Sequence, residues 1–279
     1  MPKRLAIAAL ALLTACAAPA QPPAQQQKGR AQQMESVKAD CMKRKGFKYV
    51  AYVAPMRIND TEDDKRRRAG DYQAMLKFRQ KRGFGVFDKF VYPELDKSSL
   101  FPANPNDKIM ARLSDDQADA YLNAKDACFT LAAKQVLGKT VRSEADYLQQ
   151  MNRRGEQLEA GRLDTDPLLI ELAARTADCL RAKGYSIARS NPSSLPYRGL
   201  FAFLKERNAI GRSQQKEPRN NELSYRPSLT PKEARPYLDR EIAAALDDLE
   251  CGTDFYAAYN PRGVEIDRQI DEEFGMSSD

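Results

Sequence analysis

A nine-residue motif that contains a cysteine occurs twice in this sequence of 279 residues. It reads ADCMKRKGF at residues 39–47 and ADCLRAKGY at residues 177–185, so the copies share Ala, Asp, Cys, Lys and Gly at matching positions. An apolar stripe with helical spacing precedes each glycine, and a glycine in the left-handed conformation commonly ends a helix. The motif therefore predicts two helices that stop at Gly46 and Gly184, the second with Asp166 as its N-cap.

A second pair of similar segments marks the start of two further helices. LSDDQADAYL at residues 113–122 and LTPKEARPYL at residues 229–238 both place Ser or Thr three residues before Gln or Glu, which is a capping box. The first helix is expected to run through Cys128. The second is expected to be kinked or restarted at Pro236 and to continue past Cys251. We call the two helices that end in the nine-residue motif the ADC helices. Each ADC helix is followed by a later helix that carries one cysteine.

These two helix pairs indicate two diverged copies of one unit. We assign residues 34–138 to a first helical unit, residues 139–166 to a connecting helix and residues 167–279 to a second helical unit. A charged helix is expected near residues 61–82, and FGVFDKFVYP at residues 84–93 is a candidate short strand. The expected fold class is mainly α: a helical domain built from two diverged repeats with few short strands.

Four cysteines lie in the predicted helices: Cys41, Cys128, Cys179 and Cys251. Four cysteines permit three pairings. A unit that stabilised itself before duplication would carry its own bridge, so the repeat favours disulfides between Cys41 and Cys128 and between Cys179 and Cys251. The alternative is four buried free thiols, which suit apolar helix faces equally well.

The N-terminus is typical of an exported protein. MPKR supplies a basic start, and the apolar run at residues 5–13 is shorter than the about 20 residues that a membrane-spanning helix needs. Leu13-Thr14-Ala15-Cys16 closes this run and resembles the lipobox of bacterial lipoproteins. The resemblance implies that residues 1–15 are a signal peptide and that Cys16 is lipidated. The alternative is an ordinary secretory signal that is cut at an A-x-A-like site further along.

Residues 16–33 are expected to form the lipidated cysteine and a tether. Ala, Pro and Gln dominate this stretch and offer almost nothing to bury, so the tether is predicted to be disordered. Several acyl chains would hold the protein durably on a membrane. Ala17, directly after the cysteine, favours the outer membrane facing the periplasm if the host has one.

The sequence contains no histidine, which excludes several classes of active site. A Ser-His-Asp triad, a Cys-His pair and a His-ligated zinc site cannot be built without it. The cysteines are too far apart for C-x-x-C metal knuckles, and no P-loop or G-x-S-x-G elbow is present. We therefore expect no metal site and no cofactor.

The charged residues favour solvated helix faces. The formal net charge is +6, and the densest basic run, residues 65–68, follows three acidic residues at the favourable i,i+4 spacing, so no nucleic-acid partner is expected. Five acids are the obvious candidates for catalysis: Asp247, Asp248, Glu250, Glu272 and Glu273. They lie in helical patterns, where a solvated face is the default interpretation.

Together these motifs resemble a group of uncharacterised secreted bacterial proteins, many of them lipoproteins. The resemblance rests on a C-[ML]-x-x-x-G-[FY] helix end, an NPND-like turn before L-S-x-x-[EQ], and a cysteine-bearing E-I-A-x-A helix. In this sequence the matching segments are Cys41–Phe47, Asn104–Asp107, Leu113–Gln117 and Glu241–Cys251. The resemblance implies a helical, exported protein and adds no chemistry, because the group has no established activity.

The favoured function is that of a lipid-anchored bacterial envelope protein with a non-catalytic binding or scaffolding role. The expected partners are the membrane, through the lipid anchor, and an envelope protein or cell-wall component. The alternative is an envelope hydrolase that acts on glycan or peptide through paired carboxylates. Two carboxylates about 5 to 10 Å apart in a cleft would favour the hydrolase, whereas an exposed aromatic or apolar groove would favour binding.

Overall fold

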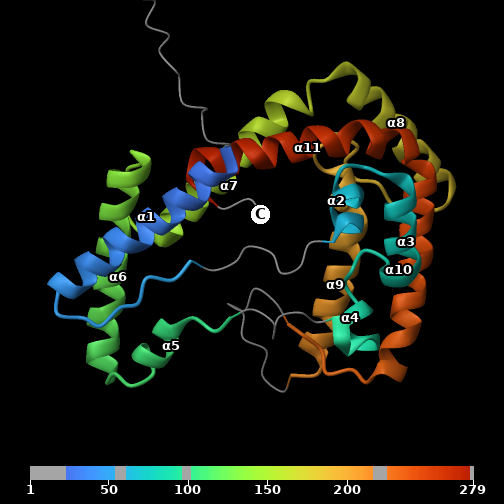
Figure 1. The fold of residues 1–279 in the computed structure, drawn as a ribbon. Coiled ribbons are helices and arrows are strands. Elements are labelled where there is room, and N and C mark those ends of the chain that lie inside the picture. The colour runs from blue at the N-terminus through green and yellow to red at the C-terminus, as the bar shows by residue number, and fades with distance from the viewer. Residues whose placement is uncertain (1–22, 54–60, 96–101, 216–224, 277–279) are drawn as a thin grey trace, which may run out of the picture.

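The computed structural model describes residues 23–53, 61–95, 102–215 and 225–276, and helices make up most of this part of the chain (Figure 1). The described residues form eleven α-helices and two short 3-10 helices, and none of them lies in a strand. The expected mainly α fold is confirmed, whereas the expected short strands are not found in these ranges. The α-helices are α1 (Pro23–Arg44), α2 (Glu62–Arg68), α3 (Tyr72–Arg82), α4 (Asp88–Val91), α5 (Pro105–Met110), α6 (Asp115–Leu137), α7 (Glu144–Arg162), α8 (Pro167–Ala182), α9 (Arg198–Ser213), α10 (Pro231–Cys251) and α11 (Thr253–Phe274), and the 3-10 helices are η1 (Pro93–Leu95) and η3 (Leu195–Tyr197).

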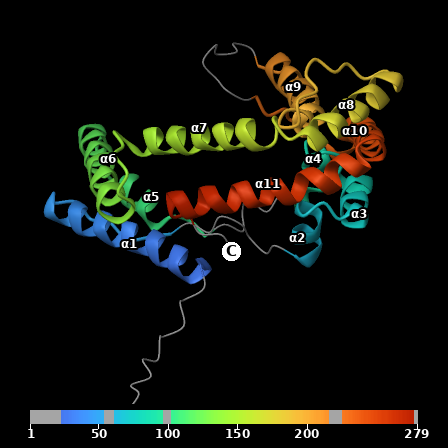
Figure 2. The ribbon, with the colours of Figure 1, turned by 90° about the horizontal axis from the view of Figure 1, so that it is seen from above.

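Two long helices, α7 and α11, run side by side and join two groups of helices (Figure 2). We call α1, α5 and α6 the first body, and α2, α3, α4, α8, α9 and α10 the second body. Helix α7 packs Tyr147 into the first body and Leu158 into the second, whereas α11 packs Phe255 into the second body and Phe274 into the first. Each long helix therefore contributes buried side chains to both ends of the molecule.

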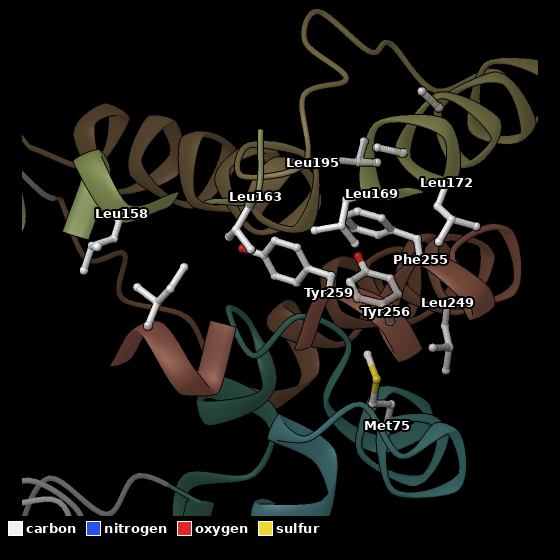
Figure 3. Close-up of a cluster of buried hydrophobic side chains, with 13 residues drawn as sticks. Met75, Leu158, Leu163, Leu169, Leu172, Leu195, Leu249, Phe255, Tyr256 and Tyr259 are labelled. Carbon is white, nitrogen blue, oxygen red and sulfur yellow. The ribbon is translucent and has the colours of Figure 1, made fainter. Parts of the chain in front are cut away.

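The core of the second body is one apolar cluster that also includes the two long helices (Figure 3). Met75 comes from α3, Leu158 from α7, Leu172 from α8, Leu249 from α10 and Tyr256 from α11. All five side chains are nearly excluded from solvent. The cluster fixes the positions of these helices relative to one another, because buried side chains are packed about as densely as in organic crystals.

Two disulfide bonds join the helix pairs that the sequence singled out. Cys41 of α1 is bonded to Cys128 of α6, with a Cα–Cα distance of 5.5 Å. Cys179 of α8 is bonded to Cys251 of α10, with a Cα–Cα distance of 5.6 Å. The predicted pairing is confirmed, and such bridges are typical of an oxidising compartment outside the cytoplasm. Among the described helices, none combines the length and apolar character needed to cross a membrane.

Both ADC helices end with the same backbone geometry. Gly46 and Gly184 have φ angles of 84° and 89°, in the left-handed region that favours glycine. The N–H of the following aromatic residue donates to the carbonyl five residues earlier at 3.0 Å in both copies. This is the Schellman pattern, and it satisfies a carbonyl that the helix itself leaves without a partner.

The aromatic residue after each glycine contacts the helix that carries the bonded cysteine. Phe47 packs edge-on against Tyr121 of α6, with ring centroids 5.6 Å apart. The Tyr185 hydroxyl donates to the Asp247 carboxylate of α10 at 2.7 Å. Each disulfide is thus accompanied by a contact of the aromatic residue six positions after the cysteine, which holds the same two helices together.

The predicted helix starts are confirmed. Ser114 with Gln117 and Thr230 with Glu233 each form a complete capping box, at the start of α6 and of α10 respectively. The Asp166 side chain accepts hydrogen bonds from two backbone N–H groups at the start of α8. Side-chain caps of this kind stabilise a helix by about 1 kcal/mol each, because they satisfy donors that would otherwise be orphaned.

Part of the predicted tether is helical. Helix α1 begins at Pro23, so residues 23–33 extend the ADC helix and are not a disordered linker. The Arg30 side chain donates to the Glu272 carbonyl at 3.1 Å, which ties this extension to α11. The Ala- and Gln-rich composition suggested disorder, but both residues have good helix propensity. They can therefore continue a helix whose later turns are packed against the rest of the protein. Cys16 and residues 17–22 lie outside the described residues.

Several expected helices divide or end earlier than predicted. The charged segment at 61–82 forms two helices, α2 and α3, with Gly70 between them. Helix α10 continues through Pro236 and ends at Cys251, and a new helix begins at Thr253. A glycine lies within two residues of each early end, Gly70 after α2 and Gly252 after α10, and glycine is the poorest helix former after proline. Glu62, Asp63 and Asp64 of α2 each form an ion pair at i,i+3 spacing, with Lys65, Arg66 and Arg67 respectively.

The candidate strand at residues 84–93 is wrong. Gly83 and Gly85 have φ angles of 59° and 90°, so the backbone turns sharply before α4 and η1. The buried carboxylate of Glu241 accepts hydrogen bonds from the next two backbone N–H groups. A side chain from α10 therefore satisfies the donors that a neighbouring strand would otherwise pair.

The packing interleaves the two predicted sequential units. Residues 62–95 were assigned to the first unit, yet α3 and α4 pack on α10, and the Arg79 side chain donates to the Ala245 carbonyl at 2.7 Å. Helix α11 was assigned to the second unit, yet it ends in the first body beside α1 and α6. The boundaries 34–138 and 167–279 therefore do not enclose separate packed bodies.

Candidate functional site

A cleft lies where the second body meets the two long helices. Its deeper part has a volume of about 290 Å³ and is lined from α2, α3, α9 and α11. A shallower part of about 640 Å³ continues along α7 and α11. The two parts share Glu159, Tyr197 and Asp267, so we treat them as one cleft.

Aromatic side chains line much of the cleft. Tyr197 and Phe201 stand on its shallower part, with ring centroids 6.0 Å apart, and Phe78 and Phe84 line the deeper part. Phe201 is 62% exposed, the highest value for a large apolar side chain among the described residues. Exposed aromatic rings with polar groups around them commonly mark a surface that binds another molecule.

A carboxylate pair faces the same cleft from the two long helices. Glu159 comes from α7 and Asp267 from α11. Burial raises the pKa of Glu159 above its usual value, and the nearby negative charge of Asp267 raises it further. Burial also raises the pKa of the Tyr259 hydroxyl far above its ordinary value, with Tyr197 and Glu159 adding to the effect. These acids and phenols therefore form one electrostatically coupled group.

Arginines line the deeper part of the cleft and are absent from the lining of the shallower part. Arg67, Arg68 and Arg79 all contribute to the deeper part. The Arg67 guanidinium lies 4.4 Å from the centroid of the Phe78 ring, and burial lowers its pKa. Its Nε is buried and has no hydrogen-bond partner in the described part of the chain. The cleft thus offers positive groups in its deeper part and carboxylates where its two parts meet.

A buried polar network supports the deeper part of the cleft. The Arg79 guanidinium donates to the Asp248 carboxylate at 2.7 Å, and the Tyr256 hydroxyl donates to the same oxygen at 2.5 Å. The Arg198 guanidinium lies 3.6 Å from the other Asp248 oxygen. Burial raises the pKa of Tyr256 far above its ordinary value, so its hydroxyl keeps its proton and remains a donor. The network holds α3 and α9 against α10 behind the cleft.

Glu241 positions the turn that brings Phe84 into the cleft. Its side chain is completely buried, and its two oxygens accept from the N–H groups of Val86 and Phe87 at 2.8 Å each. Burial raises the pKa of this carboxyl to about 7, although the backbone donors act in the opposite direction. The group therefore changes protonation near neutral pH, where an ordinary glutamate does not.

The stability of the protein is expected to depend on Glu241 between pH 4.5 and 7. The folded state binds this proton more tightly than the unfolded state, so its contribution is fully present below pH 4.5 and is lost as the pH rises through about 7. The loss amounts to about 3 kcal/mol. Urea unfolding of the wild type and of Glu241→Gln at several pH values measures it. A difference between the two proteins that stays constant from pH 4.5 to 7.5 would contradict the assignment.

The five acids proposed from the sequence lie outside the cleft: Asp247, Asp248, Glu250, Glu272 and Glu273. Asp247 and Glu250 both bind the Lys183 ammonium, at 2.7 and 2.9 Å, on a partly exposed face. Asp248 is buried in the network behind the cleft, and the last two acids pair with basic residues near the end of α11. The predicted solvated face fits Asp247, Glu250, Glu272 and Glu273, which are at least partly exposed. It is wrong for Asp248, which is 1% exposed because its partners Arg79 and Tyr256 bind it inside the fold.

Sequence reasoning missed Glu159 and Asp267. Neither stands in a recognisable motif, and more than a hundred positions separate them, so only the pairing of α7 with α11 brings them together. Within the described part of the chain, no group of acidic or cysteine side chains has the arrangement of a metal site. No protein-family model, curated protein or solved structure matches this chain.

Proposed function

We propose that this chain is a lipid-anchored protein of the bacterial envelope whose cleft binds a polar chain molecule without transforming it. The observation that carries the proposal is the exposed pair Tyr197 and Phe201 beside the cleft. Aromatic faces of this kind stack on sugar rings and on peptide side chains, and the arginines of the deeper part and the carboxylates where the two parts meet would fix the orientation of the bound chain. Cell-wall glycan and its peptides have this chemistry.

The proposed anchor is Cys16, at the end of the lipobox-like segment. Replacing it by serine is expected to abolish acylation, because the acyl group is attached to the cysteine sulfur. Cells labelled with a fatty-acid analogue, followed by fractionation, measure the effect, and Ala17→Ser serves as a control that keeps the label. If Cys16→Ser still carried label and sedimented with membranes, another residue would be the anchor.

The binding proposal is tested by crosslinking in intact cells and by cosedimentation with purified cell-wall material. Tyr197→Ala combined with Phe201→Ala is expected to weaken cosedimentation by about tenfold or more, because buried aromatic residues commonly dominate binding energy. Tyr72→Ala is the matched control, since Tyr72 is 38% exposed, close to the 41% of Tyr197, and does not line the cleft. Equal sedimentation of all variants would refute the cleft as the binding site.

A hydrolase is the second candidate, and the carboxylate pair favours it. A glutamate with a raised pKa can act as a general acid, and a second carboxylate nearby can serve as base or nucleophile. Glu159 and Asp267 would fill these roles. Release of soluble fragments from cell-wall material, lost in Glu159→Gln while binding persists, would establish catalysis and overturn the non-catalytic proposal.

We also propose that the two disulfide-bonded helix pairs descend from one duplicated unit. The shared features are the glycine cap, the aromatic residue after it, the capping box of the later helix and the bridge itself. In this view the segments between each pair diverged later. The repeat therefore has a structural role and leaves the cleft to residues outside it.

A further inference from the structure

A second cavity, of about 260 Å³ and open to solvent, lies between α1, α6 and the start of α7 and shares no lining residue with the cleft. Met34, Phe129 and Leu148 contribute to its apolar surface. Glu35 and Lys38, from α1, are polar residues of the same lining. The volume suits a molecule of roughly the size of a substituted benzene, somewhat below the usual range of about 300 Å³ and more for drug-sized ligands.

Lys38 is the unusual residue of this cavity, because it is only 5% exposed. Its ammonium pairs with the Glu35 carboxylate and lies 5.2 Å from the centroid of the Tyr49 ring and 5.8 Å from that of Phe129. An ammonium carries three N–H donors. In the described part of the chain, Glu35 is the one hydrogen-bond acceptor of Lys38. Donor capacity therefore remains for an oxygen atom placed in the cavity.

Glu35 itself is fully engaged. One oxygen accepts from Lys38, and the other accepts from the Tyr49 hydroxyl at 2.9 Å and from the Tyr52 N–H at 3.1 Å. These bonds hold the carboxylate in place, so the ammonium is presented to the cavity in a fixed position. The rings of Tyr49 and Phe129 both lie within 6 Å of the ammonium, so the cation is set among aromatic side chains.

The charges of the lining balance. Lys38 and Glu35 form one ion pair, and Lys125 and Glu144 form a second at 2.9 Å near the surface. Asn104 and three tyrosine residues supply the remaining polar side chains. A charged ligand would bring an uncompensated charge into this apolar space, which is costly, whereas a neutral acceptor would complete the coordination of the ammonium.

We propose that this cavity is a binding site for an uncharged molecule with an aromatic body and a carbonyl oxygen, which accepts a hydrogen bond from Lys38. The ring lies against Phe129 and Leu148, and the oxygen points to the ammonium. The proposal is independent of the cleft, because the two sites have no residue in common.

Three related probes test the ligand class with the purified full-length chain. Acetophenone has the ring and the carbonyl, benzoate carries a charge, and ethylbenzene lacks the acceptor. Ligand-observed NMR titration is expected to show acetophenone binding at least about tenfold more tightly than either of the others, as a hydrogen bond to a charged group would give. Lys38→Met is expected to remove the preference for acetophenone over ethylbenzene.

Two tryptophan variants locate the site without touching its ion pairs. Leu148→Trp is expected to fill the cavity and abolish acetophenone binding, because Leu148 lines it and is 44% exposed. Leu122→Trp is the matched control, since Leu122 is 45% exposed on α6, lies outside this lining and is expected to leave binding unchanged. Absent acetophenone binding, binding that survives Leu148→Trp, or benzoate binding as tightly as acetophenone would overturn the proposal. None of these outcomes bears on the Tyr197 and Phe201 experiment at the cleft.

Discussion

Replacing Cys41 and Cys128 together by alanine is expected to lower the free energy of unfolding by about 4 kcal/mol. The bridge closes a loop of 87 residues, so its removal restores much conformational freedom to the unfolded chain. Both cysteines are also buried, at 6% and 0% exposure, so α1 and α6 lose packed atoms at their contact. Equilibrium urea unfolding without reductant measures the change. A loss below about 1 kcal/mol would show that the helix contact alone holds the first body together.

The second bridge provides the comparison for this experiment. Cys179→Ala with Cys251→Ala opens a loop of 72 residues, so the entropic effect is expected to be nearly as large. These two cysteines are partly exposed, unlike the buried pair. A thiol reductant is therefore expected to open the bridge between Cys179 and Cys251 first, which timed alkylation and peptide mapping can follow. Simultaneous reduction of the two bridges would contradict the role given to burial.

Asp248→Ala is expected to destabilise the protein by about 3 to 5 kcal/mol, because it leaves the buried Arg79 guanidinium without its carboxylate partner. The Tyr256 hydroxyl loses its acceptor in the same variant. The remaining bond from Arg79 to the Ala245 carbonyl supplies no counter-charge. Thermal and urea unfolding both report the change, and the deeper part of the cleft is expected to lose shape with it.

A double variant separates the cost of an unpaired charge from the loss of packing. Arg79→Met combined with Asp248→Leu removes both charges and keeps similar volume, so it is expected to be more stable than Asp248→Ala alone. Glu250→Ala is the control for acidic residues of α10, since Glu250 is exposed and its ion pair with Lys183 is screened by solvent and is expected to contribute little. If the double variant were as unstable as Asp248→Ala, the buried charge would not be the cause.

Local features of the chain were predictable because their physics is local. The glycine caps at 46 and 184, the capping boxes at Ser114 and Thr230 and the N-cap Asp166 all depend on groups within a few residues of one another. The same reasoning failed at residues 84–93, where the decisive contact comes from a distant helix. Glu241 supplies the acceptors there, and nothing in the neighbouring sequence indicates it.

The disulfides lie between these two cases. Their pairing is a long-range fact, yet the duplicated motif made it predictable, because each copy was expected to carry its own bridge. No repeated motif indicated the residues of the candidate site. Glu159, Asp267 and the pair of Tyr197 and Phe201 come from α7, α11, η3 and α9, and only the packing of these elements forms the cleft.

The helical class, the caps at Gly46 and Gly184 and the cysteine pairs could be read from the chain alone, whereas the sharing of the helices between two bodies depends on long-range packing. Helices α3 and α4 pack in the second body and not with the other helices of their predicted unit. The reason is that Arg79 and the turn before α4 form their hydrogen bonds with residues of α10. The end of helix α11 lies in the first body, because Phe274 is buried there against residues of α1 and α6. Which helices pack together depends on which apolar surfaces and buried charges are complementary across the fold. Helical periodicity predicts that one face of a helix will be buried, but it does not predict which other helix will cover that face.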